Sequence, residues 1–133
     1  MRLSFSETMR GHVRRNGHDH PIEFTVTARA EGLGYFTLDG TCEADPFTQG
    51  PVTGSLQLKL VGFGRFIRYR LALPGGYRLE AEKTPSLLQP VRSMTWMPVK
   101  LLDRDGALVA EGEMTFALRE LPAFVFSALP VGR

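Results

Sequence analysis

The stretch ETMRGHVRRNGHDHPIEFTV, residues 7–26, contains both arms of a β-hairpin and the turn between them. Asn16-Gly17 is suited to the positive φ angles of a type I′ turn, so a two-residue loop is predicted there. The register that follows pairs Arg15 with His18, Arg14 with Asp19, Val13 with His20, Gly11 with Ile22, Met9 with Phe24 and Glu7 with Val26. One face of the hairpin is apolar almost throughout, which predicts two strands with one buried side.

A second hairpin is predicted around Pro74-Gly75-Gly76, taken as a three-residue loop. Its inward pairs are Leu73 with Tyr77, Leu71 with Leu79 and Tyr69 with Ala81. The outward residues then form opposite-charge pairs, Arg70 with Glu80 and Arg68 with Glu82. The agreement between the apolar and the charged faces supports this register.

The last hairpin is predicted to turn at Asp105-Gly106. It pairs Leu101 with Ala110, Val99 with Gly112, Met97 with Met114 and Thr95 with Phe116, with Lys100 opposite Glu111 on the outer face. The chain shows no convincing helical period before residue 121, so the predicted class is all-β. We expect a single antiparallel up-and-down barrel of about eight strands, because closure buries all the apolar faces and leaves no free edge.

The domain organisation predicted is one barrel over residues 1–119 and an apolar tail over 120–133. The tail would pack on the barrel or on a partner in a homodimer, together with the outward-facing Trp96. The segment Asp45–Gly54 contains two prolines and two glycines, so we expect a long loop there that forms a lid at one barrel mouth.

Composition limits the class of protein. The chain has 133 residues, 43% of them hydrophobic and 23% charged, which is enough for one core without metal or disulfide staples. The single cysteine, Cys42, cannot form an intramolecular disulfide, and residues 1–10 lack the apolar run of a signal peptide. We therefore expect a cytoplasmic protein, and no stretch is long enough to insert into a membrane.

The charge pattern does not favour nucleic acid as a partner. The formal net charge is +2, and basic and acidic residues are interspersed. Arg65, Arg68 and Arg70 alternate with aromatic residues, which would suit a nucleic-acid stripe. The predicted cross-strand pairing of Arg68 and Arg70 with glutamates favours a solvated outer face instead.

The interior of such a barrel holds either packed side chains or one small ligand. Inward positions include Gly11, Gly40, Gly112 and five alanines, which leave room between larger residues, although filled barrels also mix small and large residues. The candidate ligand-binding residues are Glu7, Met9, Phe24, Tyr69, Tyr77, Thr95, Met97 and Met114.

Glu7 is the main anomaly of the interior, because strand alternation places a carboxylate on the apolar face between Phe5 and Met9. A buried carboxylate must be hydrogen-bonded, paired or neutralised by a raised pKa. Tyr69, Tyr77, Thr95 and Lys83 are its candidate partners. Glu7 would anchor a ligand's hydroxyl or carbonyl group, act as a general base, or simply be a structural residue or one that reaches solvent.

No metal site or nucleophile is predicted. His18 and His20 share one strand face, but His12 points to the other, so three ligands do not converge. Cys42 has inward parity and no histidine beside it, which favours a buried, inert thiol. Ser93 and Thr95 lack a nucleophile motif, so no catalytic residue is assigned.

Three short segments carry a resemblance to a known family. They are Phe5-Ser6-Glu7-Thr8-Met9-Arg10-Gly11, Arg68-Tyr69-Arg70-Leu71, and the Asp105-Gly106 hairpin with Ala110-Glu111-Gly112. Together they resemble a bacterial lipocalin-like (calycin) β-barrel module, found alone or beside cholesterol-oxidase-like flavoenzymes of the glucose-methanol-choline (GMC) class. The resemblance implies a lipocalin-like barrel and an apolar or sterol-like ligand, and it makes Glu7 part of a Phe-x-Glu-x-Met-x-Gly pattern.

The sequence therefore predicts, first, a non-enzymatic binder of a small apolar, lipid- or sterol-like molecule. An accessory or protein-interaction domain with a filled core is the second hypothesis, and an isomerase or proton-transfer enzyme that uses Glu7 is the third. No cofactor is expected: the chain has no G-x-G-x-x-G segment for a flavin, so any oxidase activity would belong to a separate partner enzyme.

Overall fold

The structure, a computed structural model, describes residues 4–32, 34–59, 64, 66–84 and 96–116. These residues form eight strands and one short 3-10 turn. The elements are β1 (Ser4–Arg15), β2 (His18–Gly32), β3 (Tyr35–Ala44), β4 (Thr48–Lys59), β5 (Phe66–Ala72), η1 (Pro74–Gly76), β6 (Arg78–Lys83), β7 (Trp96–Leu102) and β8 (Leu108–Phe116).

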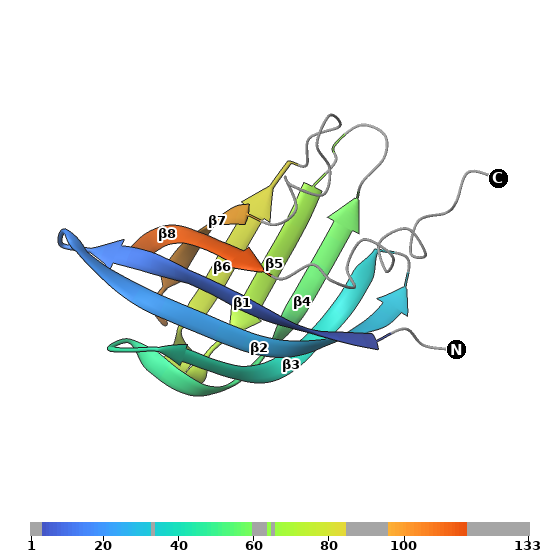
Figure 1. Cartoon of the computed structure of the whole chain (residues 1–133), viewed down its shortest axis with the longest axis horizontal. Coiled ribbons are helices and arrows are strands. Elements are labelled where there is room, and N and C mark those ends of the chain that lie inside the picture. Colours follow the sequence, from blue (N-terminus) through green and yellow to red (C-terminus); the bar gives the residue numbers. More distant parts are fainter. Residues whose placement is uncertain (1–3, 33, 60–63, 65, 85–95, 117–133) are drawn as a thin grey trace.

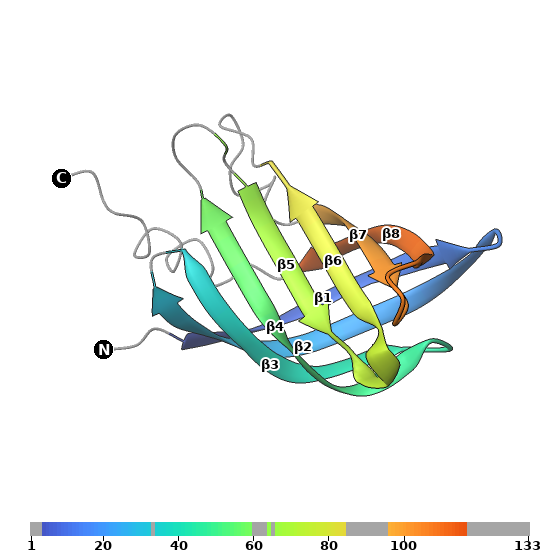
Figure 2. The same cartoon turned by 180° about the vertical axis from the view of Figure 1, so that it is seen from behind.

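Each strand pairs antiparallel with the next one in the chain, and β8 pairs with β1 to close a barrel. Figures 1 and 2, which view the molecule from opposite sides, place β1–β3 along one wall and β4–β6 along the other. This all-β, up-and-down meander is the predicted fold, and it is consistent with a lipocalin-like barrel. Within the described residues no helix is long and apolar enough to cross a membrane.

The predicted registers of the hairpins are confirmed. All six pairs predicted for the first hairpin occur between β1 and β2, where Asn16 and Gly17 have φ angles of 52° and 78°. The β5–β6 and β7–β8 registers also agree with the prediction wherever both partners are described. The structure does not describe Thr95, which was predicted to pair with Phe116, or the tail over 120–133.

The predicted loop and lid at residues 45–54 are wrong. The turn occupies only residues 45–47, with a cis peptide bond between Asp45 and Pro46, and β4 already begins at Thr48. Pro51 therefore lies inside a strand. It pairs with Thr41 of β3, but the ladder between β4 and β5 covers only Thr53–Lys59. Pro51 thus needs no N–H for a second ladder, and this is the kind of strand position where proline is tolerated.

The barrel has two different ends. The four hairpin turns near residues 16, 46, 75 and 105 lie at one end, which we call the turn end. At the opposite end β1 begins at Ser4, β4 and β6 finish at Lys59 and Lys83, and β7 begins at Trp96. Inward residues from all eight strands fill the space between the two ends with one apolar core.

Candidate functional site

Among the described residues, Glu7 is the charged side chain that is buried. It lies on β1, closer to the opposite end than to the turn end, and only 5% of its surface is exposed. Strand alternation explains its place, because Met9 and Val13 are inward on the same strand and are also buried. The predicted inward position of Glu7 is therefore confirmed, and the side chain does not escape to solvent.

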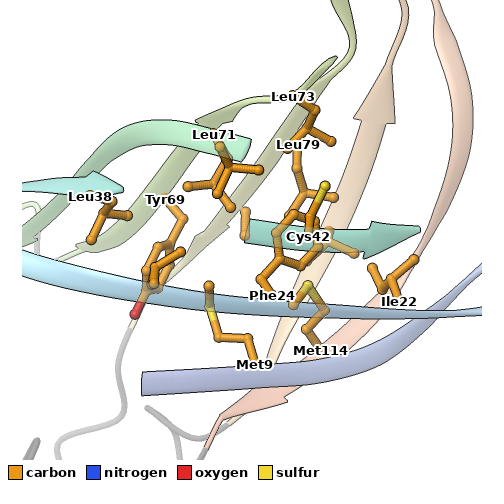
Figure 3. Packing of buried hydrophobic residues seen from close by; sticks show 14 of the residues in the cluster. Met9, Ile22, Phe24, Leu38, Cys42, Tyr69, Leu71, Leu73, Leu79 and Met114 are labelled. Atoms are coloured by element: carbon orange, nitrogen blue, oxygen red, sulfur yellow. The ribbon is translucent and has the colours of Figure 1, made fainter. Parts of the chain in front are cut away.

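Tyr69 of β5 is the partner of Glu7 inside the barrel. Its hydroxyl donates a hydrogen bond of 2.5 Å to Oε1 of Glu7, although the two residues are 62 positions apart in the chain. Tyr69 is itself buried, with 2% of its surface exposed. In Figure 3 its hydroxyl oxygen, drawn in red, lies at the edge of the cluster formed by Met9, Leu71 and the other apolar side chains.

Burial changes the acidity of both groups. Desolvation raises the pKa of the Glu7 carboxyl from 4.5 to about 7, and the hydrogen bond from Tyr69 opposes part of this rise. The pKa of Tyr69 is raised well above its usual value, first by burial and then by the adjacent Glu7 carboxylate. Near neutral pH, Glu7 therefore changes readily between its neutral and ionised forms, while Tyr69 keeps its proton.

The second carboxyl oxygen of Glu7, Oε2, does not accept the hydrogen bond from Tyr69. Oε2 of Glu7 is buried and has no hydrogen-bond partner in the part of the chain that the structure describes. Buried polar atoms are nearly always hydrogen-bonded, because an unmade bond costs roughly 1–3 kcal/mol. Oε2 is thus an available position for one polar group of a bound molecule.

Four of the predicted ligand-binding residues line one small internal void. Met9, Tyr69, Met97 and Met114 surround it, and Leu71, Leu79, Ala81 and Val99 complete its wall. The volume of the void is about 10 Å³. This is about the space of one water molecule, so the void as it stands holds no lipid-sized ligand.

Glu7 is not among the residues that line this void, although its partner Tyr69 is, and the other predicted site residues lie elsewhere or outside the described residues. Phe24 is fully buried and is the register partner of Met9. Tyr77 is half-buried and follows the η1 turn, so it lies at the turn end, whereas Glu7 lies nearer the opposite end. Thr95 falls outside the described residues. Sequence parity gave Tyr69 and Tyr77 the same inward face, but only Tyr69 reaches Glu7.

The inward glycines do not provide ligand space. A Cβ atom at Gly11 would overlap the backbone oxygen of Glu113, and one at Gly112 would overlap that of His12. Gly40 meets the backbone of Thr25 in the same way. These glycines let neighbouring strands approach closely as the barrel bends, so the expectation that they leave room in the interior is wrong.

Lys83 does not pair with Glu7. Its ammonium group donates to the backbone oxygen of Trp96 at 2.7 Å and lies 4.6 Å from the centroid of the Trp96 ring. Trp96 is 40% exposed on the outer face, as predicted, and its indole N–H donates to Oε2 of Glu113 at 2.8 Å. Lys83 is therefore not the partner of Glu7.

The described histidines and Cys42 do not form a catalytic or metal-binding cluster with one another. His20 packs edge-on against Phe47, with ring centroids 5.3 Å apart, and His18 is exposed. No set of three His, Cys, Asp or Glu side chains within the described segments is placed to hold a metal ion. Cys42 is buried as predicted, and burial raises the pKa of its thiol.

On the outer face of β5 both predicted pairs, Arg68 with Glu82 and Arg70 with Glu80, are opposite each other in register, but among the described residues only the first forms an ion pair. Arg68 donates to Glu82 at 2.5 Å and to the side chain of Gln57 at 3.2 Å, and its guanidinium lies 4.4 Å from the centroid of the Phe66 ring. A shallow hollow of about 320 Å³ lies further round the wall, lined by His12, Arg14, Val99, Lys100, Glu111, Gly112 and Glu113. Its lining mixes both signs of charge, and the sequence had not indicated it.

Two comparisons of the sequence with known proteins found no match. No model of a known protein family matches the chain, and no curated protein matches its sequence.

Proposed function

We propose that the protein binds one small apolar molecule inside the barrel and that Glu7 anchors the molecule's single polar group. The observation that carries this proposal is Oε2 of Glu7, a buried carboxyl oxygen without a hydrogen-bond partner among the described residues. Ligand sites are mostly apolar with a few placed polar groups, and the surroundings of Glu7 have this composition. A bound polar group would remove the desolvation cost of Oε2.

Space for the apolar part would come from the methionines. Met9, Met97 and Met114 all border the 10 Å³ void beside Tyr69. Methionine has three rotatable bonds and fits irregular shapes, so these side chains can change rotamer at lower cost than branched residues. On this proposal the void is the closed form of a site that opens when an apolar molecule enters.

The resemblance to bacterial lipocalin-like modules adds a narrower proposal. Such modules are found alone or beside flavoenzymes of the GMC class, so the bound molecule would be lipid- or sterol-like, and any oxidase activity would belong to a separate partner enzyme. The eight-stranded antiparallel barrel is compatible with this role. The chain itself would act without a cofactor.

The test is native mass spectrometry of the purified protein, combined with organic extraction of any molecule it carries. We expect a co-purified apolar molecule that is lost or reduced in Glu7→Leu and in Ala81→Val, since Ala81 lines the void. Glu23→Gln is the matched control, because Glu23 lies on the outer face and pairs with Arg10 at 2.8 Å. Folded variants that keep the wild-type amount of ligand would contradict the site.

A filled-core interaction domain is the second candidate, and the small volume of the void favours it. In that case the outward Trp96, with Lys83 and Glu113 around it, would contact a partner protein or a second copy. An empty protein that forms a stable dimer or partner complex in the same spectra would move this candidate to first place. Proton-transfer catalysis by Glu7 remains third, and it requires turnover of a substrate in addition to binding.

A further inference from the structure

The Glu7–Tyr69 pair restricts the chemistry of the group that a ligand presents to it. Tyr69 donates to Oε1, so Oε2 is the carboxyl oxygen available to a ligand. On the strands beside β1, the inward residues Phe24 and Val26 of β2 and Met114 of β8 are apolar, and the inward His20 of β2 pairs with Val13 near the turn end. The site therefore suits an apolar molecule with one hydrogen-bonding group.

Charge argues against a fatty acid as that molecule. The titratable residues at inward positions on the other strands are Tyr69 on β5, Cys42 on β3 and Lys83 on β6. The ammonium of Lys83 is occupied with Trp96, and the pKa of Glu7 is shifted by burial and by Tyr69 rather than by a cation. A ligand carboxylate beside Glu7 would place two like charges in an apolar interior, so one of the two would have to be protonated.

A hydroxyl group suits Oε2 better than a carbonyl or an amine does. Near neutrality the Glu7 carboxyl is present in both forms, because its pKa is raised to about 7. A hydroxyl can donate to the ionised carboxylate and accept from the neutral acid, whereas a carbonyl can only accept and an ammonium can only donate. An ammonium would also have to lose its hydration in the apolar core.

We propose that the natural ligand is a neutral alcohol, an apolar molecule whose single hydroxyl binds Oε2 of Glu7 beside Tyr69 and the three methionines. This inference rests on the proposed ligand-binding function and narrows its ligand class. Sterol-like and long-chain alcohols belong to this class, whereas free fatty acids do not.

Three probes of equal chain length test the proposal: decan-1-ol, decan-2-one and decanoic acid. Their dissociation constants are measured by calorimetry with the full chain at about pH 6 and about pH 8. At the higher pH we expect decan-1-ol to bind about tenfold tighter than decanoic acid, because decanoate can bind only when Glu7, whose pKa is about 7, takes up a proton. The affinity for decan-2-one should fall as the pH rises, because only the neutral carboxyl donates to a carbonyl, while the affinity for decan-1-ol should change little.

Variants check that Glu7 is the contact. Glu7→Leu should weaken decan-1-ol binding roughly fivefold to tenfold, and the outer-face control Glu23→Gln should leave it unchanged. Decanoic acid binding as tightly as decan-1-ol at the higher pH, or unchanged decan-1-ol affinity in folded Glu7→Leu, would overturn the alcohol inference while ligand binding stands. If none of the probes binds, the proposed function fails and this inference fails with it. Should Glu7→Leu not fold, the ranking of the probes on the wild-type protein still decides.

Discussion

Two consecutive residues of β5 contact carboxylates on opposite faces of the strand, one exposed to solvent and one buried in the barrel. Arg68 points outward and meets Glu82 at 2.5 Å, and Tyr69 points inward and meets Glu7 at the same distance. The side chain of Glu82 is 58% exposed, whereas Glu7 as a whole residue is 5% exposed. Equal hydrogen-bond lengths therefore accompany very different surroundings.

The difference shows that burial, more than contact distance, sets the energy of a carboxylate in this barrel. Outside, water and salt solvate and screen both partners, so the ion pair contributes little. Inside, a neutral donor satisfies one oxygen only, and the charged form is penalised by desolvation. We expect disruption of the inner contact to have large, pH-dependent effects and disruption of the outer one to have small, salt-dependent effects.

The largest expected effect concerns the stability of the wild-type protein against pH. The rise of the Glu7 pKa from 4.5 to about 7 means that the folded state binds its proton more tightly than the unfolded state does. The stability due to this group is complete below about pH 4.5, falls as the pH rises through 7, and is then lower by about 3 kcal/mol. Urea unfolding at a series of pH values gives the free energy of unfolding of wild type and of Glu7→Gln. The fall with rising pH should be present in the wild type and absent from Glu7→Gln.

The matched control for this prediction is Glu82→Gln on the outer face. It removes a carboxyl of the same chemistry, and its pH profile should keep the wild-type fall in stability between about pH 4.5 and 7. Parallel profiles for wild type and Glu7→Gln would show that Glu7 is not desolvated in the folded protein. Burial would then not distinguish the carboxylate of Glu7 from that of Glu82.

The second largest effect is expected from removal of the Tyr69 hydroxyl, which donates to Glu7. Tyr69→Phe removes the hydrogen bond to Oε1 and leaves both oxygens of Glu7 without a protein partner among the described residues, so we expect a loss of roughly 1–3 kcal/mol at about pH 8. The loss should be smaller near pH 5, where Glu7 is neutral, because the bond lowers the pKa of Glu7 and so favours its ionised form. Unfolding by urea at both pH values measures it.

Tyr35→Phe is the control for the donor, since Tyr35 is 39% exposed and its change should stay within about 0.5 kcal/mol. Equal losses for Tyr69→Phe at both pH values would mean that the hydroxyl stabilises the core independently of the charge of Glu7. In that case the pair would be an ordinary structural hydrogen bond.

The sequence predicted the parts of this arrangement that depend on one hairpin at a time. Turn dipeptides and alternation place Glu7 and Tyr69 on inward faces, and both placements are confirmed. The choice of Tyr69 over Tyr77 could not be made in this way. It depends on how β5 faces β1 across the closed barrel, which is set jointly by all the strand pairs rather than by either hairpin.

Two predictions were wrong because proline and glycine were interpreted from the local sequence alone, without the strands that lie beside them. The prolines and glycines in residues 45–54 predicted a loop, but Pro51 fits into β4. At Pro51 this strand pairs with β3 on one side and has no pairing with β5 on the other. Gly11 and Gly112 were interpreted as free interior space, but the backbone of the adjacent strand occupies the position of each missing Cβ. Both outcomes depend on strand–strand distances, which composition does not encode.

The smallest expected effect is the loss of the exposed ion pair between Arg68 and Glu82. A double-mutant cycle with Arg68→Gln and Glu82→Gln should give a coupling energy of about 0.2–1 kcal/mol in low salt, as for other exposed pairs. About 1 M salt should remove most of it, because screening then acts over roughly 3 Å. The cycle isolates the pair, since the contacts of Arg68 with Gln57 and Phe66 are lost equally in both arms that lack the guanidinium. A coupling above about 2 kcal/mol that resists salt would show that the outer face also excludes water, and Arg68 with Glu82 would then behave as a buried pair.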